Sequence, residues 1–251
     1  MKIVVIGGTG LIGSQLVNRL RQLNHEAIAA SPATGVNTIT GEGLNAVMKN
    51  TDVVVDVSNS PSFADDDVLE FFRKSTWNLI TAESYAGVKH HVALSVVGTE
   101  RHQEIGYFRG KLAQEELIRD SGIPYSILHS TQFFEFAKSI AQGATEGEEV
   151  HMSTGAIQPI ASSEVVAALA DIAVGEPLNA VVEIAGPERM SMYEFIGIYL
   201  DQTDDPRKLV SDEHARYFGA EIDDKTLVPL GDSRLGKIRY QEWLSAQLVT
   251  A

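Results

Sequence analysis

Cysteine is absent from the chain. Its absence excludes disulfide bonds, thiol catalysis and thiolate metal sites, and it suits a reducing compartment, so we expect a cytoplasmic protein. Long hydrophobic runs are missing too. The first apolar stretch, Ile3–Ile6, stops at Gly7, and no run approaches the about 20 residues of a membrane span or resembles a signal peptide, so no membrane association is expected.

Basic residues are comparatively few. The chain has 20 Lys and Arg against 34 Asp and Glu, with the basic residues scattered along it, for a formal net charge of −14. A polyanion such as DNA would be repelled over most of such a surface, so nucleic-acid binding is not expected. What the 251 residues do contain is 44% hydrophobic side chains, enough for one large domain with a small appendage.

Apolar segments alternate with amphipathic ones through the first half of the chain. The pattern predicts helices such as Asp66–Ala86 between five strands, at Lys2–Ile6, Ala27–Ala30, Asp52–Val57, His91–Val96 and Pro124–His129. Right-handed crossovers place helices on both faces of such a sheet. We therefore expect an α/β fold, a doubly wound parallel sheet that binds ligands beyond the carboxyl ends of its strands.

The alternation loosens after about Gly143. A helix, a strand and a further helix still follow, in SSEVVAALADIAVG, AVVEIAG and SMYEFIGIYLDQ, and a capping box from Ser191 to Glu194 begins the last of them. We therefore expect two parts: a core over residues 1–143, and a small C-terminal α/β substrate region over residues 144–251 that packs on the core and partly completes it.

The N-terminal glycines stand between an expected strand and an expected helix, in VVIGGTGLIGSQLV. Gly7 permits a tight turn, Gly10 lets the backbone approach a pyrophosphate, and Gly13 lets the helix pack on the strand. The start of the helix offers free N–H groups and a partial positive charge to the phosphates. A purely structural glycine turn is the alternative. The setting favours dinucleotide binding, by Gly7, Thr9, Gly10, Leu11, Ile12 and Gly13.

The end of the second expected strand, in AIAASPATG, bears on the choice of cofactor. A carboxylate about 20 residues beyond the glycines would bind the ribose 2′-hydroxyl of NAD and repel the 2′-phosphate of NADP. Ser31 stands there instead, so we expect NADP(H) rather than NAD(H), with the hydroxyls of Ser31 and Thr34 near the phosphate. The alternative is that Ser31 and Pro32 only turn the chain.

A tyrosine and a lysine four residues apart occur in YFRGK, at Tyr107 and Lys111. On a helix, residues at this spacing share one face, and an ammonium near a phenol lowers a pKa that is ordinarily about 10. Tyr107 would then exchange a proton with a carbonyl or alcohol oxygen, and Ser95, at the end of HHVALS, would donate a second hydrogen bond to that oxygen. A surface tyrosine on a solvated helix is the alternative.

The same spacing occurs in YAGVK, at Tyr85 and Lys89. Gly87 is expected to end that helix, which puts the pair at the amino end of the fourth strand. Tyr107 follows the carboxyl end of this strand, where ligands bind in a parallel sheet. We therefore assign a structural role to Tyr85 and Lys89.

Four stretches together resemble the NmrA-like, atypical branch of the short-chain dehydrogenase/reductases: VVIGGTGLIGSQLV, VALSVVG, GYFRGKLAQEELIRDSGIPYSILHSTQFFEF and IQPIASSEVVAALADIA. The resemblance covers most of the chain and implies a Rossmann core, a nicotinamide cofactor and a smaller C-terminal substrate region. It places the three glycines in the cofactor turn. It also makes Tyr107 and Lys111 the active-site pair, with Lys111 holding the nicotinamide ribose as well.

The same resemblance matches Ser95 to the family's active-site serine and places Ser58 and Asn59, in DVSNSP, beside the adenine and ribose. Two departures concern the cofactor and the pocket, because many relatives have arginine where this chain has Ser31 and His129. Some members of the branch bind NADP without turnover and act as redox sensors for protein partners. Family membership alone therefore leaves enzyme and sensor open.

Phenylalanines follow the fifth expected strand in TQFFEFA. Phe133, Phe134 and Phe136 would form the wall of an apolar substrate pocket, although two of these rings would serve equally in packing the C-terminal region on the core. The sequence thus predicts an NADP(H)-dependent oxidoreductase that transfers hydride to or from a small hydrophobic carbonyl, alcohol or quinone. The alternatives are a non-catalytic dinucleotide sensor that binds a protein partner, and an epimerase that retains its nicotinamide.

No metal site is expected. His90 and His91 are adjacent on a strand and face opposite sides, so they cannot bind one metal together. The run of aspartates at Asp65, Asp66 and Asp67 instead favours the dipole at a helix N-terminus. The sequence does not indicate an oligomeric state.

Overall fold

The computed structural model describes residues 1–250 and forms two compact units. The first unit comprises Met1–His129 and Val165–Val182, and the second comprises Ser130–Glu164 and the segment from Glu183 onward. The units are defined by contacts in space rather than by order in the sequence. Residues 130–164 belong to the second unit, and residues 165–182 belong to the first unit again. The expected boundary at residue 143 marks a different feature, the point where strands and helices stop alternating regularly.

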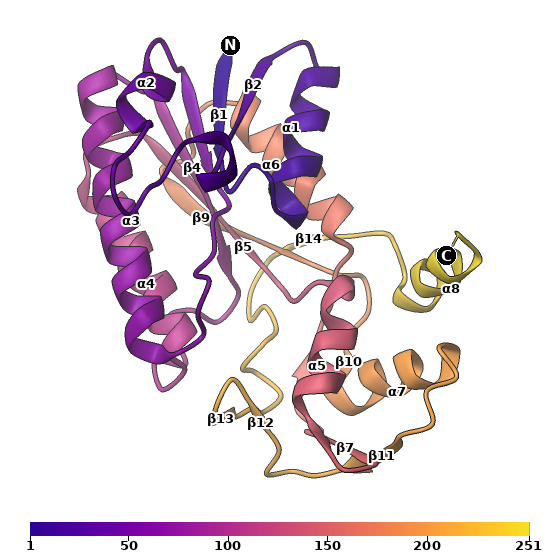
Figure 1. Ribbon diagram of the computed structural model, residues 1–251. Helices are drawn as coiled ribbons and strands as arrows, with labels where there is room; N and C mark the ends of the chain where they lie inside the picture. The colour runs from indigo at the N-terminus through magenta and orange to yellow at the C-terminus, as the bar shows by residue number, and fades with distance from the viewer. Residues whose placement is uncertain (251) are drawn as a thin grey trace. The chain divides into compact units, whose positions relative to one another are not determined.

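A seven-stranded parallel sheet carries the fold, with the strand order β14-β9-β5-β4-β3-β1-β2 (Figure 1). Its strands are β1 (Lys2–Ile6), β2 (Glu26–Ala30), β3 (Val53–Asp56), β4 (His90–Val96), β5 (Tyr125–Ser130), β9 (Ala180–Ala185) and β14 (Arg234–Leu235). Each of the five strands expected from the sequence forms, with its ends shifted by at most one residue. The doubly wound α/β fold is confirmed.

The order of the strands reverses between β1 and β3. From β1 the chain passes to β2 on one side and then returns to β3 on the other side. In a doubly wound sheet, the loops beyond the carboxyl ends of the strands at this reversal form the ligand crevice. A ligand site is therefore expected beside the segments that follow Ile6 and Asp56.

Helices cover both sides of the sheet in the first unit. Figure 1 shows α3 and α4 side by side on one side of it and α1 and α6 on the other. The helices of this unit are α1 (Leu11–Gln22), η1 (Pro32–Thr34), α2 (Leu44–Met48), α3 (Asp65–Ala86), α4 (Gly106–Asp120) and most of α6 (Ser162–Val174). None of the helices within residues 1–250 combines the length and the apolar character that crossing a bilayer requires.

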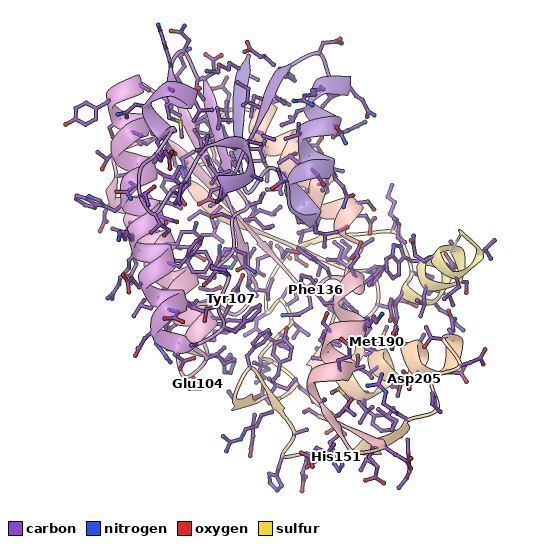
Figure 2. The ribbon with its side chains drawn as sticks, in the orientation of Figure 1. Glu104, Tyr107, Phe136, His151, Met190 and Asp205 are labelled. Atoms are coloured by element: carbon purple, nitrogen blue, oxygen red, sulfur yellow. The ribbon has the colours of Figure 1, made fainter. Side chains whose placement is uncertain are left out.

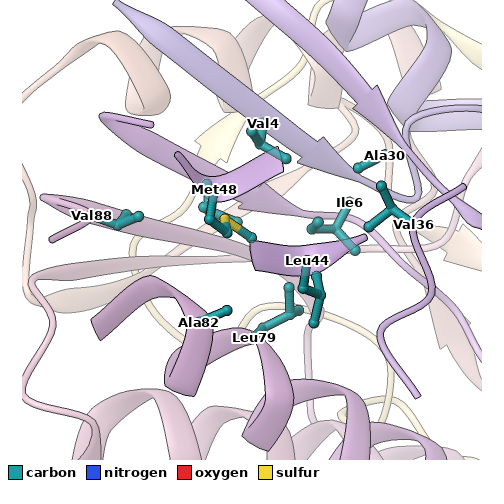
Figure 3. Packing of buried hydrophobic residues seen from close by; sticks show 10 residues of the cluster. Val4, Ile6, Ala30, Val36, Leu44, Met48, Leu79, Ala82 and Val88 are labelled. Carbon is teal, nitrogen blue, oxygen red and sulfur yellow. The ribbon is translucent and has the colours of Figure 1, made fainter. Parts of the chain in front are cut away.

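The core beneath α3 explains why the strands are apolar almost throughout. Alternate residues of β1 and β3, including Val4 and Ile6, pack against Leu79 of α3 and against Leu44 and Met48 of α2 (Figure 3). The intervening strand residues are buried on the opposite face, as in parallel sheets covered on both sides. Each fully buried side chain of this size contributes roughly 1.5–3 kcal/mol, and together they hold the strand ends in place.

Helices α3 and α4 approach each other closely. A Cβ atom at Gly110 would lie 2.8 Å from Val68 Cγ1 and 2.9 Å from Phe72 Cδ2, so this position of α4 admits only glycine without rearrangement. The close approach brings the ring of Phe72 against α4. Arg109 of α4 also forms an ion pair with Asp65 at the start of α3, at 2.6 Å.

The second unit has its own smaller elements. A three-stranded sheet has the order β11-β7-β6, and the pairs β8–β10 and β12–β13 are separate. The elements are η2 (Phe134–Phe136), α5 (Ala137–Gly143), β6 (Thr145–Glu146), β7 (Glu149–Met152), β8 (Ala156–Ile157), β10 (Met190–Ser191), α7 (Met192–Gln202), β11 (Lys208–Ser211), β12 (Arg216–Tyr217), β13 (Ala220–Glu221) and α8 (Tyr240–Thr250). The capping box of α7 is confirmed, because Ser191 and Glu194 each accept a hydrogen bond from the other's N–H.

Candidate functional site

The glycine turn joins the carboxyl ends of the three strands at the reversal point. Gly7 has a φ of +76°, and its N–H donates to the carbonyl of Ala30 at the end of β2, at 2.9 Å. A Cβ atom at Gly7 would lie 2.8 Å from Val57 O and 2.9 Å from Ser58 Cα, in the loop after β3. Both the φ angle and the loop contact therefore require glycine at this position.

Gly10 and Gly13 differ in what surrounds them. A Cβ atom at Gly13 would lie 2.2 Å from Gly7 O, so the packing of α1 on the turn requires glycine there. A Cβ atom at Gly10 would meet only Gly7 O among the described atoms within 4 Å, at an ordinary contact distance of 3.4 Å. The fold thus has no need of glycine at position 10 and leaves a space there that a ligand can occupy.

Helix α1 starts at this space. Gly10 is its N-cap, and its first turn carries no acidic side chain, whereas Arg19 and Arg21 lie in its last turn. The N–H groups of a first turn have no partner within the helix, and the helix dipole makes that end positive. Of the side chains expected in the cofactor turn, those of Thr9 and Leu11 are exposed and that of Ile12 is buried in the core.

The residues expected to select the cofactor follow β2. Ser31 is buried and immediately precedes the short helix η1. Thr34 is exposed and is the last residue of η1. The Thr34 hydroxyl accepts a hydrogen bond from the N–H of Ser31 at 2.9 Å, and carbonyl oxygens of Ala29 and Ser31 lie within 3.1 Å of it. Thr34 therefore shapes the turn in which Ser31 lies.

The loop after β3 contains an unpaired hydroxyl group. Asp56 accepts a hydrogen bond from the N–H of Ser58 at 2.9 Å, and Asn59 accepts one from the N–H of Ser60 at 3.0 Å. The hydroxyl oxygen of Ser58 is buried without a hydrogen-bond partner in the described structure. An unpaired buried oxygen beside the glycine turn, together with the space at Gly10, fits the hydroxyl and phosphate groups of a dinucleotide.

Tyr107 and Lys111 lie on one face of α4, as their spacing predicts (Tyr107 is labelled in Figure 2). The ring of Tyr107 lies 5.9 Å from that of Phe72 and 6.5 Å from that of Phe63, between ring centroids. The ammonium of Lys111 lies 4.5 Å from the centroid of Phe72. One ring of α3 therefore contacts both members of the pair.

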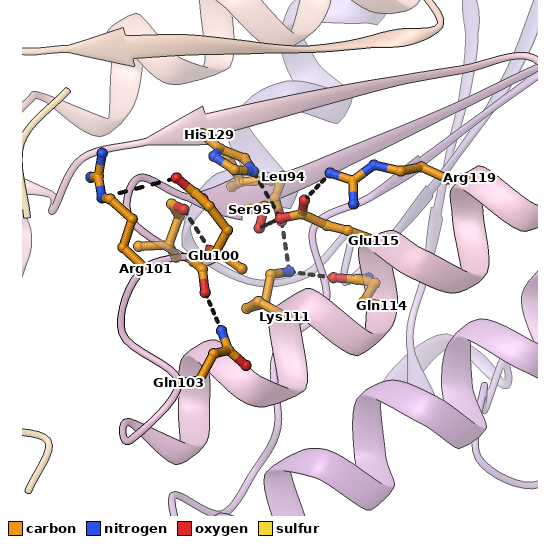
Figure 4. A network of polar contacts seen from close by, with 12 residues as sticks. Leu94, Ser95, Glu100, Arg101, Gln103, Lys111, Gln114, Glu115, Arg119 and His129 are labelled. Carbon is orange, nitrogen blue, oxygen red and sulfur yellow. Dashed lines mark hydrogen bonds and ion pairs between the residues drawn. The ribbon is translucent and has the colours of Figure 1, made fainter. Parts of the chain in front are cut away.

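The ammonium of Lys111 points into the interior rather than toward solvent. It donates to the carbonyl of Leu94 at 2.7 Å and to the side-chain oxygen of Gln114, and Lys111 is 2% exposed (Figure 4). Gln114 in turn donates to Asp56 at 2.8 Å. Burial lowers the pKa of Lys111 to about 8, although the negative charges of Asp56 and Glu115 oppose this shift.

The pKa of Tyr107 differs from the expectation. The sequence predicts a value lowered by Lys111, but burial raises the pKa of the phenol above its usual range. The physical reason is desolvation of the phenol, which has the rings of Phe63 and Phe72 beside it, while the ammonium of Lys111 is bonded to Leu94 and Gln114. The phenol of Tyr107 is therefore protonated at neutral pH.

Ser95 belongs to a second buried polar group, centred on Glu115. The carboxylate of Glu115 accepts the hydroxyl proton of Ser95 at 2.5 Å, lies 2.8 Å from His129 Nε2, and accepts from Arg119 at 2.7 Å (Figure 4). Burial alone would raise the pKa of Glu115, but the hydrogen bonds and charges of its partners lower it. The structure thus brings Ser95 to Glu115, and Tyr107 and Lys111 to Phe72.

Sequence reasoning missed Asp56, Gln114 and Glu115. Gln114 and Glu115 follow Lys111 by three and four residues, so their position on its helix face was readable from the spacing. Asp56 is the one polar residue in the strand VVVD, a signal that a side chain at this strand end has a special partner. For His129 the sequence indicates only that a histidine stands where many relatives have arginine.

The second tyrosine–lysine pair lies apart from these groups. Helix α3 ends at Ala86, and Gly87 follows in a left-handed conformation with a φ of +71°, so the expected helix end is confirmed. Tyr85 is 88% exposed. Lys89 lies beyond the helix and forms an ion pair with Asp52 at 2.8 Å.

The phenylalanines after β5 lie in the second unit. Phe134 is buried, with ring centroids 5.0 Å from Tyr240 and 5.4 Å from Trp243. Phe133 contacts Phe136 at 5.2 Å, and Phe136 is 41% exposed. Phe134 therefore packs within its unit, and the predicted contact of these rings with a substrate stays a prediction.

The histidines of β4 have separate partners, as their alternation predicts. His90 Nε2 lies 2.8 Å from the hydroxyl of Ser126, and His91 Nδ1 lies 2.9 Å from the carboxylate of Glu83. Although burial alone would lower the pKa of His91, the charge of Glu83 raises it. Residues 1–250 contain no group of three or more acidic, histidine or cysteine side chains placed to hold a metal ion.

Comparison with known proteins gives matches of three kinds. A protein-family model described as NAD(P)H-binding matches residues 7–173. The chain is 27% identical to (4-alkanoyl-5-oxo-2,5-dihydrofuran-3-yl)methyl phosphate reductase of Streptomyces griseus over 154 residues, which are 56% of this chain and 51% of that protein. It is 29% identical to NAD(P)H azoreductase of Xenophilus azovorans over 209 residues, 75% of this chain and 69% of that protein.

Among solved structures, the chain resembles the NADPH-dependent quinone oxidoreductase QOR2 of Escherichia coli. The TM-score is 0.71 at 18% identity, covering 98% of this chain and 99% of that chain. At this identity the likeness concerns the fold. The match to the first curated relative spans about half the length of that reductase.

Proposed function

Because the chain belongs to the NAD(P)H-binding family, we propose that it is an NADP(H)-dependent oxidoreductase that reduces a small hydrophobic carbonyl compound or quinone. The glycine turn is the observation that carries the proposal. Close backbone contacts require glycine at positions 7 and 13, whereas the space at Gly10 is open. An open space at the positive start of α1 suits a pyrophosphate.

We assign the parts of the dinucleotide to the turn and to two neighbouring loops. The turn residues hold the pyrophosphate through backbone N–H groups of α1. Ser58 and Asn59 contact the adenine and its ribose, and Ser31 and Thr34 hold the 2′-phosphate, because no carboxylate at the end of β2 repels it. When bound, the nicotinamide supplies the hydride for reduction.

Tyr107 is the proposed proton donor. Its phenol is protonated at neutral pH, so Tyr107 would give a proton to the carbonyl oxygen as the hydride arrives, although burial raises its pKa and makes it a weaker acid than a free tyrosine. Ser95 donates its only hydroxyl proton to Glu115, so the predicted hydrogen bond from Ser95 to a substrate oxygen requires this hydroxyl to leave Glu115.

The first prediction concerns cofactor selection. Ser31→Asp should weaken NADPH binding much more than NADH binding, because the new carboxylate repels a 2′-phosphate that carries nearly two negative charges. Fluorescence titration with each cofactor measures both affinities. Thr40→Asp, at an exposed position of the same segment, is the matched control for added charge. Equal losses for NADPH and NADH in Ser31→Asp would overturn the NADP(H) assignment.

The second prediction uses the duplicated motif. Tyr107→Phe should lower turnover by roughly 10²–10⁴-fold, the usual effect of losing a general acid, with little change in NADPH affinity. Tyr85→Phe, at the exposed copy of the motif, should retain turnover. The measurement is steady-state NADPH oxidation against a panel of ketones, aldehydes and quinones. Full activity in Tyr107→Phe would remove the proposed acid.

A dinucleotide sensor is the second candidate, and the burial of two predicted active-site residues favours it. Ser95 and Lys111 are each 2% exposed, with their polar atoms bonded to neighbouring groups. NADPH binding without turnover on any compound of the panel would support the sensor. Nicotinamide cofactor that stays bound through purification would instead support the third candidate, an epimerase.

A further inference from the structure

The carboxylate of Asp56 connects two segments that the proposed function treats separately. One carboxylate oxygen accepts the N–H of Ser58 at 2.9 Å, and this bond fixes the loop assigned to the adenine ribose. The other oxygen accepts the side-chain amide of Gln114 at 2.8 Å, on α4. Asp56 is fully buried, so neither bond competes with water.

Gln114 continues the connection to Lys111. Its amide nitrogen donates to Asp56, and its amide oxygen accepts from the ammonium of Lys111. Gln114 is itself fully buried, so each end of the amide has a definite partner. A glutamine is suited to this place because it offers a donor to an anion and an acceptor to a cation at the two ends of one rigid group.

The ammonium of Lys111 is buried among few hydrogen-bond acceptors, so its contact with Gln114 matters for its stability. The carbonyl of Leu94 accepts a second hydrogen bond from Lys111, and the ring of Phe72 lies against the ammonium. The charged or titratable groups facing it are Asp56 of β3, His91 of β4 with its partner Glu83 of α3, and Glu115 of α4. Loss of the amide oxygen of Gln114 would therefore leave the ammonium short of a partner in a buried place.

We propose that Gln114 is a positioning residue that holds the ammonium of Lys111 and, through Asp56, couples it to the Ser58 loop, so that both parts of the cofactor site are set together. The proposal rests on the proposed function for the role of the Ser58 loop at the adenine ribose, and on the family resemblance for the role of Lys111 at the nicotinamide ribose. Gln114 itself does not touch the cofactor. Its effect on binding passes through Lys111 and the loop.

A double-mutant cycle tests whether Gln114 acts through Lys111. Gln114→Leu should weaken NADPH binding roughly tenfold or more, the usual effect of removing a hydrogen bond to a charged group. In a Lys111→Met background, the same change should have a clearly smaller effect, because the main target of Gln114 is already gone. Equal effects in the two backgrounds would overturn the proposal. Glu116→Gln, exposed on the same helix, is the control and should bind like the wild type.

The pH dependence provides a signature that a merely structural role would not produce. NADPH affinity should fall as the pH rises through the pKa of Lys111, near 8, because the ammonium loses its charge. Gln114→Leu should move this fall to lower pH, since it removes an acceptor from the ammonium, whereas the exposed Glu116→Gln should leave the fall in place. An unchanged or higher midpoint in Gln114→Leu would contradict the proposal.

A measurement without cofactor separates this inference from the proposed function. The pKa of Lys111 can be followed by ¹³C NMR of its Cε atom in the free protein, where Gln114→Leu should again lower it and Glu116→Gln should leave it unchanged. A protein that reduces nothing on the panel would refute the oxidoreductase and leave this test intact. An unchanged Lys111 titration in folded Gln114→Leu would refute the positioning role even in an active enzyme.

Discussion

The turn has glycine at positions 7, 10 and 13, and the reason for glycine differs from one position to the next. At Gly13 the reason is internal, because a Cβ atom would lie 2.2 Å from a backbone oxygen. At Gly7 it is the φ of +76° as well as the neighbouring loop. At Gly10 the chain itself offers no obstacle, so the benefit of glycine there has to come from a ligand.

This difference gives a prediction at the residue scale. Gly10→Ala should keep the stability of the wild type and weaken binding of NADPH and NADH alike, by about tenfold or more, because the new methyl group occupies the space of the pyrophosphate. Gly13→Ala should instead lower the free energy of unfolding by about 1–3 kcal/mol through overpacking. Urea denaturation and fluorescence titration measure the two quantities. Unchanged affinity in Gly10→Ala would mean that the glycine serves only the turn.

At the scale of elements, α4 organises the polar interior of the first unit. Lys111, Gln114 and Glu115 follow one another at helical spacing, and they reach Asp56 on β3, Ser95 on β4 and a histidine on β5. Glycine at position 110 lets α4 approach α3 closely enough for this. One helix therefore positions residues near the ends of three strands. Substitutions on its buried face should alter the hydrogen bonds at each of these strand ends.

The buried carboxylate of Glu115 gives a pH-dependent prediction. Its pKa in the folded protein lies below the ordinary value of 4.5, so its contribution to stability is present above that pH and is lost as the pH falls through the folded pKa. Glu115→Gln should lower the free energy of unfolding by about 3 kcal/mol at pH 7, because His129 and Arg119 lose a charged partner. The difference from the wild type should shrink below pH 4.5.

Urea denaturation from pH 7 to pH 3.5 tests this expectation. Glu116→Gln, at the exposed neighbouring position, should differ from the wild type by no more than about 0.5 kcal/mol over the range. A difference between wild type and Glu115→Gln that stays constant down to the lowest pH would show that Glu115 acts through its shape rather than its charge.

At the scale of the whole molecule, the formal charge of −14 opposes an anionic cofactor. At the phosphates, attraction comes from local dipoles, namely the start of α1 and the hydroxyls of Ser31 and Thr34. The ammonium of Lys111 is buried beside the negative charges of Asp56 and Glu115, which offset its field at long range. Such dipoles act over short distances, whereas the net charge acts over the length set by salt screening.

The association rate of NADPH should therefore rise as salt increases from about 0.01 M to 0.15 M, because screening weakens the long-range repulsion. The rise should be smaller for NADH, which lacks the 2′-phosphate. Stopped-flow fluorescence measures both rates. A rate that falls with added salt would mean that a cationic side chain attracts the phosphate, and it would contradict the assignment to Ser31 and Thr34.

The sequence by itself determined the α/β fold, the strands and the glycine turn, because these depend on local patterns. Short apolar runs between amphipathic segments are typical of buried strands between helices, and a glycine-rich link between a strand and a helix turns the chain tightly. Helix ends were equally readable. Gly87 and the Ser191–Glu194 box act on the backbone within a few residues of themselves.

Only the tertiary structure decided where the polar side chains of the site find their partners. Spacing places Tyr107 and Lys111 on one face, but the ring of Phe72 and the amide of Gln114 decide that the ammonium turns inward and that burial raises the pKa of the phenol. Ser95 likewise meets Glu115 because β4 lies beneath α4. Hydrogen bonds and desolvation depend on neighbours far away in the chain, which a local pattern does not specify.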